Sequence, residues 1–399
     1  MSTFTASSAA ADASPTRVAT RAEAVVDVDA ISSNVRVLLN RMRTRNAAAT
    51  VMAVVKADGY GHGAVSAARA ALAGGATRLG VATPTEALQL RAAGLDVPTV
   101  AWLWPPGEGI AEALARDVEV GVSSLGHLAA VLDQARVGVP GIHVKVDTGL
   151  GRGGVGSAEV AALLDAVAAA QRAGRVRVVG LMSHLASADV PGDASVAEQT
   201  ATFHRILAAA ADRGIDPQVR HLANTAGLID HPDTHFDLAR VGIGAYGLNP
   251  VATPTPLTPA MTLQATVALT KRVPAGQGVS YGLTYRTNRE TTLALIPLGY
   301  ADGIPRAASN RGEIWVAGAR RRIAGRVAMD QVVVDCGDDP VNAGDPAVVF
   351  GPGDHGEPTA RDWAEYCDTI DYEIVTRIGP RVPRRNVGEA VQSAHGGSR

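Results

Sequence analysis

The strongest constraint on how this chain can fold is a regular alternation of short β-branched runs with alanine-rich helical segments. It extends from residue 50 to about residue 245. Its eight β-branched runs lie at 50–55, 78–83, 97–104, 118–123, 142–147, 176–184, 218–223 and 237–242. Near-continuous apolar strands with helical crossovers are typical of a parallel sheet that helices cover. Eight repeats predict an α/β fold, a (β/α)8 TIM-type barrel, although a doubly wound sheet could use the same pattern.

The alternation stops at residues 249–260, a segment that carries four prolines. Beyond it, stretches such as MTLQATVALTKRV, GEIWVAG and DPAVVFG alternate in polarity and are separated by turn residues. This pattern, with little helix, predicts a C-terminal, mainly antiparallel β domain. We therefore expect the barrel at residues 22–260 and the β domain at residues 261–387. Residues 24–29 precede the first barrel helix and could return to pair with the β domain.

Composition narrows the class of function. The chain has 399 residues and a formal net charge of −2, which gives no footprint for nucleic acid or for an anionic membrane. Its two cysteines, Cys336 and Cys367, are too few for a disulfide framework and do not fit a zinc spacing. No apolar run approaches the roughly 20 residues of a membrane span, and no secretory signal is evident. We expect a cytoplasmic protein with disordered tails at 1–21 and 388–399.

Unusual polar residues follow the predicted strands at their carboxyl ends, where barrel enzymes place their active sites. Lysine, arginine and histidine dominate this set, so the mouth of the barrel should be cationic and suit an anionic ligand. The residues are, in chain order, Lys56, Lys145, Asp147, Arg152, His184, His221, Asn224 and Arg240.

The loops after the seventh and eighth runs are those that commonly hold phosphate in such barrels. Here Thr225 supplies a hydroxyl group, and the glycines at 242 and 244 let backbone N–H groups approach closely. Tyr60, four residues beyond Lys56, could donate another hydrogen bond. A lysine that can form a Schiff base, opposite a phosphate cradle, suggests pyridoxal phosphate as the cofactor.

Two other motifs are weaker. GLGRGG at 149–154 matches a dinucleotide-binding fingerprint, but it follows the fifth run, and the next run has no acid placed for a ribose. His231 and His235 have helical spacing, but they flank Pro232 and lack the intervening glutamate of a zinc motif. We expect neither a dinucleotide site nor a metal site.

Taken together, the motifs resemble those of the alanine racemases, pyridoxal-phosphate enzymes of fold type III. AVVKADGYGHG resembles the cofactor-lysine signature of this family. VKVDTGLGRGG, HLANTAG, RVGIGAYGL, VSYGLTY, PLGYADG, GRVAMDQ and DYEIVTRIGPRVPR follow in the family's order, over residues 22–386. The resemblance implies a barrel, a C-terminal β domain, and a head-to-tail homodimer with shared active sites. It implies interconversion of L- and D-alanine, supplying D-alanine for peptidoglycan.

The resemblance also implies roles for single residues. Lys56 would hold the cofactor and act as one catalytic base, and Tyr281 of the partner subunit would be the other. The cofactor-binding residues would be Lys56, Tyr60, His184, Asn224, Thr225, Arg240, Gly242, Ile243 and Tyr372. The substrate carboxylate would be bound by Arg152, the Met329 backbone and Asp330. Supporting residues would be Lys145, His221 and, near the entrance, Asp189, Tyr300, Arg306 and Arg326.

Racemisation accounts for this choice of residue types, because a proton leaves one face of Cα and another returns to the opposite face. Lysine and tyrosine ordinarily have pKa values of about 10.4 and 10, and a cationic neighbourhood lowers both. Arg240 at the pyridine nitrogen would keep that nitrogen largely unprotonated and so disfavour transamination. Two departures from the family pattern are small: Thr225 replaces the common serine, and Ala328 replaces a frequent cysteine.

Some alternatives stay open at this point. The chain could be a racemase of broader specificity for serine and other small amino acids. It could also be a non-catalytic protein of this fold that binds the cofactor or an inhibitor, although small cofactor carriers lack the β domain and its tyrosine. Lys145 could be carbamylated, as is frequent in the family, or form an ordinary ion pair with Asp147.

Overall fold

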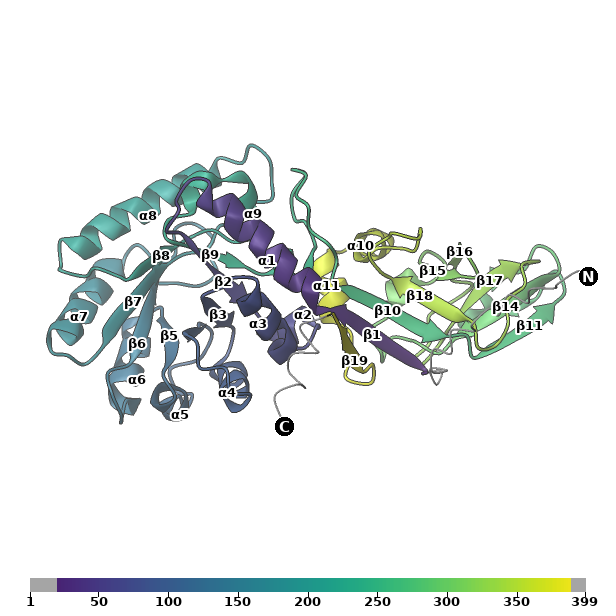
Figure 1. The fold of residues 1–399 in the computed structure, drawn as a ribbon, viewed down its shortest axis with the longest axis horizontal. Coiled ribbons are helices and arrows are strands. Elements are labelled where there is room, and N and C mark those ends of the chain that lie inside the picture. Colours follow the sequence, from purple (N-terminus) through teal and green to yellow (C-terminus); the bar gives the residue numbers. More distant parts are fainter. Residues whose placement is uncertain (1–19, 389–399) are drawn as a thin grey trace, which may run out of the picture.

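The computed structural model describes residues 20–388 and consists of two lobes joined side by side (Figure 1). The tails predicted at 1–21 and 388–399 lie outside the described residues, apart from Thr20, Arg21 and Gly388. One lobe holds a parallel sheet with its helices, and the other holds mainly antiparallel sheets.

The first lobe is an eight-stranded parallel sheet in the order β8-β7-β6-β5-β4-β3-β2-β9. Its strands are β2 (Thr50–Val54), β3 (Arg78–Val81), β4 (Thr99–Ala101), β5 (Val118–Val122), β6 (Gly141–Lys145), β7 (Arg177–Met182), β8 (Val219–His221) and β9 (Leu238–Val241). The edge strands β8 and β9 approach one another. Backbone N–H groups of Asp237 and Arg240 donate to the carbonyls of Arg220 (3.2 Å) and Ala223 (3.0 Å). The sheet is thus nearly closed, and the predicted barrel is confirmed.

Helices cover the outside of this sheet (Figure 1). They are α1 (Val28–Arg43), α3 (Ala64–Ala73), α4 (Pro84–Ala92), α5 (Ala111–Ala115), α6 (Leu125–Gln134), α7 (Val160–Arg172), α8 (Ser195–Ala211) and α9 (Thr225–Asp230). Several begin at side-chain caps, which satisfy backbone N–H groups that have no partner within the helix. Asp27 caps α1, Ser124 caps α6, and Thr83 with Glu86 forms a capping box at α4.

The second lobe contains a six-stranded sheet in the order β16-β15-β18-β10-β1-β19, a three-stranded sheet β11-β14-β17, and the pair β12-β13. The strands are β1 (Ala22–Asp27), β10 (Met261–Thr266), β11 (Leu269–Val273), β12 (Gly278–Val279), β13 (Tyr285–Arg286), β14 (Thr291–Ile296), β15 (Glu313–Val316), β16 (Ala319–Arg322), β17 (Val332–Gly337), β18 (Pro346–Phe350) and β19 (Arg384–Val387). All neighbours are antiparallel except β1 and β19. Two helices, α10 (Ala360–Cys367) and α11 (Asp371–Thr376), also occur where we expected little helix.

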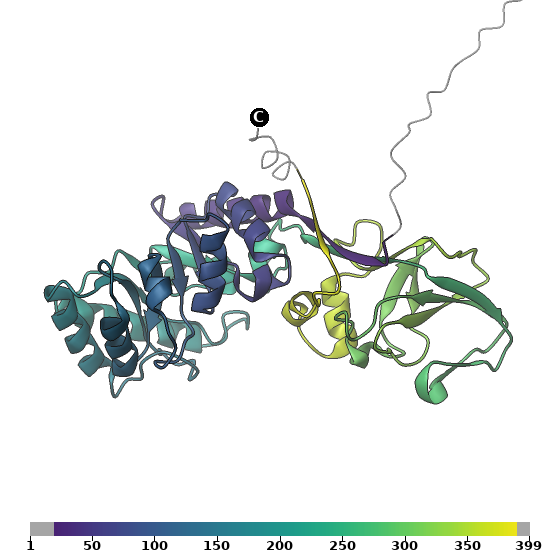
Figure 2. The same cartoon turned by 90° about the horizontal axis from the view of Figure 1, so that it is seen from below.

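The two ends of the described chain meet in this second lobe (Figure 2). Strand β1 pairs antiparallel with β10 and parallel with β19, so the first of the described strands lies inside the six-stranded sheet. Helix α1 then leads directly from β1 to the barrel. One continuous set of buried apolar side chains extends through both lobes, from Ala22 to Val382. The lobes therefore share a core as well as a chain crossing.

A left-handed turn follows the first barrel strand. Residues 57–60 all have positive φ angles, between 52° and 62°, and ψ is near 50° at 57–59. Such a conformation costs an L-residue about 1–2 kcal/mol, so the surroundings must hold it. Glu86 accepts the Ala57 N–H at 2.7 Å, and Asp58 accepts the Ala64 N–H at 2.9 Å. The turn separates Lys56 from Tyr60 by about one helical repeat and brings both side chains to the same cavity.

The same loop is also the seam between the lobes. Arg384 of β19 donates from Nε to the Gly61 carbonyl at 2.9 Å. A Cβ at Gly61, where φ is +81°, would lie 2.3 Å from the Val375 carbonyl oxygen of α11. Glycine at 61 is therefore required both by the backbone angle and by the close approach of α11.

Alanine substitutions should separate these two requirements. Gly63→Ala is a matched control, because φ is +94° there but nothing lies within 4 Å of a Cβ. We expect Gly63→Ala to lower the free energy of unfolding by about 1–2 kcal/mol through backbone strain alone. Gly61→Ala should cost a further 1–3 kcal/mol, roughly, because α11 must shift. Urea unfolding of the full-length chain measures both, and equal losses would contradict the close contact.

Candidate active site

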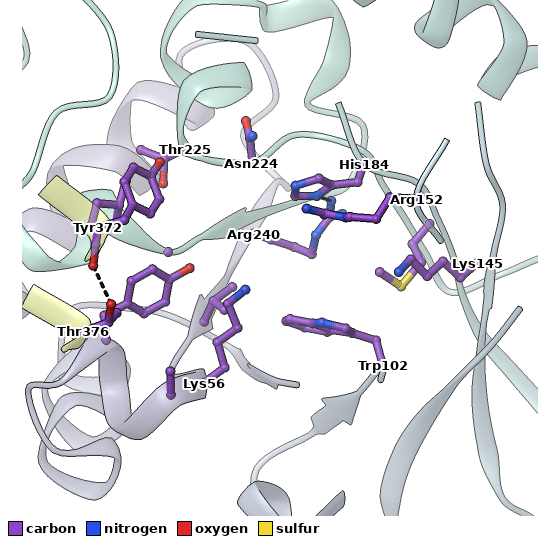
Figure 3. Close-up of a pocket in the computed structure, with 16 residues that line it drawn as sticks. Lys56, Trp102, Lys145, Arg152, His184, Asn224, Thr225, Arg240, Tyr372 and Thr376 are labelled. Atoms are coloured by element: carbon purple, nitrogen blue, oxygen red, sulfur yellow. Dashed lines mark hydrogen bonds between the residues drawn. The ribbon is translucent and has the colours of Figure 1, made fainter. Parts of the chain in front are cut away.

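A cavity of about 470 Å³ opens at the carboxyl ends of the barrel strands (Figure 3). In Figure 3 the Lys56 amine and the Trp102 ring lie between Tyr372 on one side and Lys145 on the other. Eleven residues that the sequence assigned to the site line this cavity. They are Lys56, Tyr60, Lys145, Arg152, His184, Asn224, Thr225, Arg240, Gly242, Ile243 and Tyr372. Tyr372 comes from α11, so both lobes contribute to one cavity within a single chain.

Lys56 extends into this cavity without an ion pair or hydrogen bond to any described residue. Its Nζ lies 5.9 Å from the centroid of the Tyr60 ring. Burial lowers the pKa of Lys56 from its ordinary value, the charges of Arg152 and Arg240 add to this effect, and Glu86 opposes it. The lowered pKa increases the neutral fraction of the amine, which is the form that acts as a nucleophile or a base.

Arg240 is buried at the inner end of the cavity and is held by acceptors at the end of β8 and in the loops that follow β7 and β8. Nη1 donates to Nδ1 and to the carbonyl of His221, at 3.2 and 2.9 Å. Nη2 donates to the carbonyls of Ser183 (2.7 Å) and Leu222 (3.0 Å) and to Nδ1 of His184 (3.1 Å). Burial lowers the pKa of Arg240 to about 10, so it stays a cation at neutral pH. Nε–H is its one donor that has no partner among residues 20–388.

His184 is a neutral donor at the cavity wall. Because its Nδ1 accepts a hydrogen bond from Arg240, the ring proton is assigned to Nε2. Burial and the charges of Arg240 and Arg152 lower the pKa of His184 to about 3. Nε2–H has no hydrogen-bond partner within the described part of the chain, so it is available to a group that enters the cavity.

Two tyrosine hydroxyl groups also lack a hydrogen-bond partner among the described residues. The rings of Tyr60 and Tyr372 lie 6.3 Å apart, and Tyr60 is 8% exposed. Burial raises the pKa of Tyr60 to about 12 and also raises that of Tyr372, so both phenols keep their protons. Because a buried tyrosine hydroxyl usually has a partner, two donors aimed at one space favour an anion there.

The glycines at 242 and 244 make room for these hydroxyl groups. A Cβ at Gly242 would lie 2.4 Å from the Tyr60 oxygen, and one at Gly244 would lie 2.5 Å from Cγ2 of Thr225. Thr225 Oγ1 accepts the Gly244 N–H at 3.4 Å. The side-chain oxygen of Asn224, in contrast, accepts a backbone N–H and caps α9. The hydroxyl groups of Tyr60 and Thr225 thus lie close to the backbone of 242–244.

The GLGRGG loop is not a dinucleotide motif in this structure. After β6 it folds back, so that Val155 donates to the Lys145 carbonyl (2.9 Å) and accepts from the Asp147 N–H (3.0 Å). The following helix, α7, begins only at Val160. The loop's function in the fold is to bring Arg152 to the cavity.

Lys145 does not form the alternative ion pair with Asp147. The Asp147 carboxylate instead accepts backbone N–H groups of Gly149 and Gly151, at 2.9 and 3.2 Å. No salt bridge to Lys145 occurs within residues 20–388. Burial lowers the pKa of Lys145, and the nearby charges of Arg240 and Arg152 lower it further.

The remaining sequence-assigned residues lie outside this cavity. Tyr281 begins the short 3-10 helix η3 (Tyr281–Leu283), is 72% exposed, and lines a separate groove with Ala328. Met329 and Tyr300 are exposed on the same lobe. Asp330 accepts a hydrogen bond from Arg381 at 2.7 Å. Within one chain, therefore, Tyr281 and Met329 do not line the cavity that holds Lys56.

The four other supporting residues occupy different surroundings. Arg306 and Arg326 are exposed on the second lobe. Asp189 is exposed and lines a shallow pocket with Tyr372, next to the main cavity. His221 is fully buried behind Arg240.

Five lining residues were not predicted from the sequence: Val54 and Ala57, which flank the Lys56 segment, and three that lie elsewhere. Trp102 and Met182 lie at the carboxyl ends of β4 and β7, and Thr376 lies one helical turn after Tyr372 on α11. A strand-end rule that included apolar residues would have found Trp102 and Met182, and i,i+4 spacing on a helix would have found Thr376.

Removing a nearby cation and removing a nearby anion should move the pKa of Lys56 in opposite directions. Arg152→Gln removes a cation that lowers this pKa, and Glu86→Gln removes an anion that raises it. In cofactor-free protein at about pH 8, reductive methylation of Lys56 should become several-fold slower in Arg152→Gln and faster in Glu86→Gln. Peptide mass spectrometry measures the rates, with exposed Lys271 as the internal standard. Identical rates in all three proteins would refute this electrostatic account.

Two family models match the chain: "Alanine racemase, N-terminal domain" over residues 26–250 and "Alanine racemase, C-terminal domain" over residues 260–386. An alanine racemase of Thermobifida fusca is 57% identical over 371 residues, 92% of this chain and 98% of that one. Alanine racemase from D-cycloserine-producing Streptomyces lavendulae has a TM-score of 0.90 at 51% identity, covering 93% and 98% of the two chains. A Bartonella henselae alanine racemase with covalently bound pyridoxal phosphate has a TM-score of 0.82 at 30% identity, covering 92% and 100%.

A lysine amine at the mouth of a barrel, with a β lobe that lends a helix to the same cavity, defines a two-domain barrel enzyme. The matched segments include every strand of the barrel and nearly all of the second lobe. The chain belongs to the alanine racemase family, and with it to the isomerases that act on amino acids. The resemblance expected from the motifs is confirmed. Within residues 20–388, no helix is long and apolar enough to cross a membrane.

Proposed function

We propose that this protein interconverts L-alanine and D-alanine with pyridoxal phosphate as its cofactor. The observation that carries the proposal is the set of unpaired groups at one cavity: an amine with a lowered pKa, two phenol hydroxyls and one N–H of a buried arginine. Membership of the alanine racemase family supports the choice of reaction. We further propose a cytoplasmic location, in keeping with two free cysteines, and a supply of D-alanine to peptidoglycan.

The groups at the cavity fit pyridoxal phosphate. Lys56 offers an amine to the aldehyde, and Nε–H of Arg240 offers a donor to the ring nitrogen. Protonated phenols suit a phosphate because its oxygens accept hydrogen bonds. When bound, the cofactor supplies an electron-withdrawing ring that makes the Cα–H of an amino acid more acidic. The phosphate would be held by Tyr60, Thr225, Gly242, Ile243 and Tyr372.

Racemisation requires a base on each face of Cα. Nζ of Lys56 takes or returns the proton on one face, and its lowered pKa increases the share of the amine that is neutral. The Tyr281 oxygen of the partner subunit acts on the opposite face, and Nε2–H of His184 stabilises that oxygen when it has lost its proton. Arg152 binds the substrate carboxylate, together with the Met329 backbone and Asp330 of the partner subunit.

Arg240 directs the reaction towards racemisation. A guanidinium cannot give up its proton near neutral pH, so beside the ring nitrogen of a bound cofactor Arg240 would act only as a donor and would leave that nitrogen unprotonated. Arg240 would thereby weaken the electron withdrawal that the cofactor supplies and disfavour transamination.

A head-to-tail homodimer is part of the proposal. Large apolar side chains are exposed on the second lobe near the Tyr281 groove, among them Tyr281, Leu283, Tyr300 and Met329. Exposed apolar groups that gather in this way are typical of a protein–protein contact. If the second lobe of one subunit covers the barrel mouth of its partner, Tyr281 completes a site that otherwise holds only one of the two bases.

Mixed dimers test the shared site. Lys56→Ala and Tyr281→Phe each remove one base, so each homodimer should lose at least about a hundredfold in kcat. When equal amounts of the two variants are dissociated and reassociated together, half of the dimers are mixed and each of these holds one intact site. About one quarter of the original activity should therefore return. The assay follows loss of optical rotation by L-alanine.

In a matched control, Lys56→Ala is mixed with the double variant Lys56→Ala/Tyr281→Phe. No dimer of this mixture can hold an intact site. Recovery in neither mixture would mean that each site is complete within its own chain. A visible absorption band that borohydride bleaches, with the pyridoxyl group on the Lys56 peptide, is the accompanying test of the cofactor. A band without alanine turnover would favour a binding protein.

Carbamylation of Lys145 is a further part of the proposal. The neutral Nζ attacks carbon dioxide, a nitrogen–carbon bond forms, and one proton leaves to solvent. The lowered pKa of Lys145 and the absence of an ion pair with Asp147, among the described residues, support this step. The product is an anion beside two cations, Arg152 and Arg240, so it would hold Arg152 in place for the substrate.

Lys145→Ala should therefore reduce kcat by about ten- to a hundredfold, because Arg152 loses its anchor. Added acetate should restore part of the loss by replacing the carbamate anion, and a carbon-13 carbamate signal should disappear from bicarbonate-labelled protein. Lys271→Ala, an exposed lysine on β11, is the control and should change neither result. Full activity of Lys145→Ala without acetate would exclude the carbamate.

A further inference from the structure

A row of buried polar side chains runs through the barrel behind Arg240, where barrels ordinarily carry layers of Val, Ile and Leu. Nε2 of His221 lies 2.9 Å from Nδ1 of His143, and Nε2 of His143 lies 2.8 Å from Oε2 of Glu119. Nη1 of Arg78 donates to both Glu119 oxygens, at 3.1 and 2.9 Å. The two histidines are fully buried, and Glu119 and Arg240 are each 5% exposed. Buried charges are costly unless each one is paired, so this row needs an explanation.

Each hydrogen bond in this row fixes the direction of the next. A carboxylate only accepts, so His143 donates from Nε2 to Glu119. Burial lowers the pKa of His143 and of His221, so each neutral ring carries one proton. Nδ1 of His143 must then accept from Nε2–H of His221. Nδ1 of His221 is left to accept from Nη1 of Arg240, at 3.2 Å. All donation thus runs one way, from Arg240 to Glu119.

Gly180 on β7 is an independent sign that the His143 ring must lie in this place. A Cβ at Gly180 would lie 2.1 Å from Nδ1 of His143 and 2.7 Å from its Cε1. The φ angle of Gly180 is one that other residues adopt, so the backbone does not require glycine there. The space that the missing side chain leaves is the space that the ring occupies as it reaches His221.

We propose that Glu119, His143 and Arg78 are positioning residues that set the tautomer of His221 and thereby the orientation of Arg240. With Nδ1 of His221 as an acceptor, the Nη atoms of Arg240 are all engaged and Nε–H is left for the cavity. A proton on Nδ1 would instead face the Nη1–H of Arg240, and two donors repel. The catalytic consequence rests on the proposed function; the tautomer is a property of the chain itself.

Two substitutions at Glu119 make a matched test. Nη1 of Arg78 and Nε2 of His143 both donate to Oε2 of Glu119, at 2.9 and 2.8 Å. In Glu119→Gln the amide oxygen can take this position, so the direction of donation should be kept. Glu119→Leu offers no acceptor, so Nε2–H of His143 would face the cation of Arg78 unpaired. The proton of His143 should then move to Nδ1, and His221 should carry its own proton on Nδ1, towards Arg240.

Nitrogen-15 chemical shifts of the histidine rings report the tautomers in the full-length dimer, with and without the cofactor. The unchanged protein and Glu119→Gln should carry the protons of His143 and His221 on Nε2, and Glu119→Leu should move both to Nδ1. A proton on Nδ1 of His221 in the unchanged protein would overturn the proposal, and this measurement needs no variant to fold. An unaltered tautomer in Glu119→Leu would overturn it as well.

Kinetics test the consequence for Arg240. Glu119→Leu should lower kcat by at least about tenfold, change KM by less than about threefold, and raise the share of turnovers lost to transamination, whereas kcat of Glu119→Gln should stay within about threefold of the unchanged protein. Gly180→Ala should reproduce the pattern of Glu119→Leu, because it excludes the His143 ring without changing any charge. Val120→Ala is the control: Val120 is buried next to Glu119 on β5 but on the opposite face of that strand. At a comparable fall in Tm, kcat of Val120→Ala should stay within about twofold of the unchanged protein.

The outcomes separate the two proposals. A switched tautomer with unchanged kcat and unchanged transamination would overturn the positioning role. Absence of racemisation by the unchanged protein would overturn the proposed function, while the tautomer measurement would still decide whether the row is directional.

Discussion

The buried guanidinium of Arg240 is the interaction on which the rest of the site depends. It remains a cation inside the barrel because three carbonyl oxygens and two imidazole nitrogens accept hydrogen bonds from its Nη atoms. Burial lowers the pKa of Lys56, Lys145 and His184, and the fixed charge of Arg240 lowers all three further. One permanent cation thus favours the neutral form of two amines and an imidazole in the same small space. Arg240 reaches these acceptors because its strand, β9, approaches β8.

The left-handed turn at residues 57–60, which follows Lys56, is a site of backbone strain, whereas Arg240 is a site of buried charge. Four consecutive left-handed residues are unfavourable alone, and contacts from α4, α11 and β19 hold them. The loop thereby joins the second lobe to the first. Lys56, Tyr60 and Tyr372 meet because helix α11 packs directly on the turn at Gly61. The cavity is in this sense a product of the contact between the lobes.

Much of this could be predicted from the sequence, for identifiable reasons. All eight β-branched runs form barrel strands because apolar strands between helical crossovers have few other solutions. The mouth of the barrel could be predicted because parallel strands end together, and eleven assigned residues line one cavity. Helices α10 and α11 were missed because they are short and lie among strands. The roles of single residues and the limits of the domains stay predictions.

The row behind Arg240 was not predicted, because Glu119 and His143 lie inside apolar runs whose inward and outward faces look alike. Which of them touch depends on the register between β5, β6 and β8, which a single sequence does not reveal. Tyr281 is a different case. It is 72% exposed in one chain and does not line the cavity, so its proposed role as a base depends on the proposed second subunit.

The pairing of β1 with β10 and β19 has a consequence for how the chain is made. Among residues 20–388, the first strand to be synthesised belongs to a sheet whose other members arrive after the whole barrel sequence, and its neighbour β19 is the last strand to arrive. Until then β1 has two unpaired edges, which is the condition in which strands join other chains. The barrel helices can form early from local contacts, but the second lobe must wait for its final strand. Truncation that removes β19 should therefore first leave one edge of β1 unpaired, because both ends of the described chain complete the same sheet.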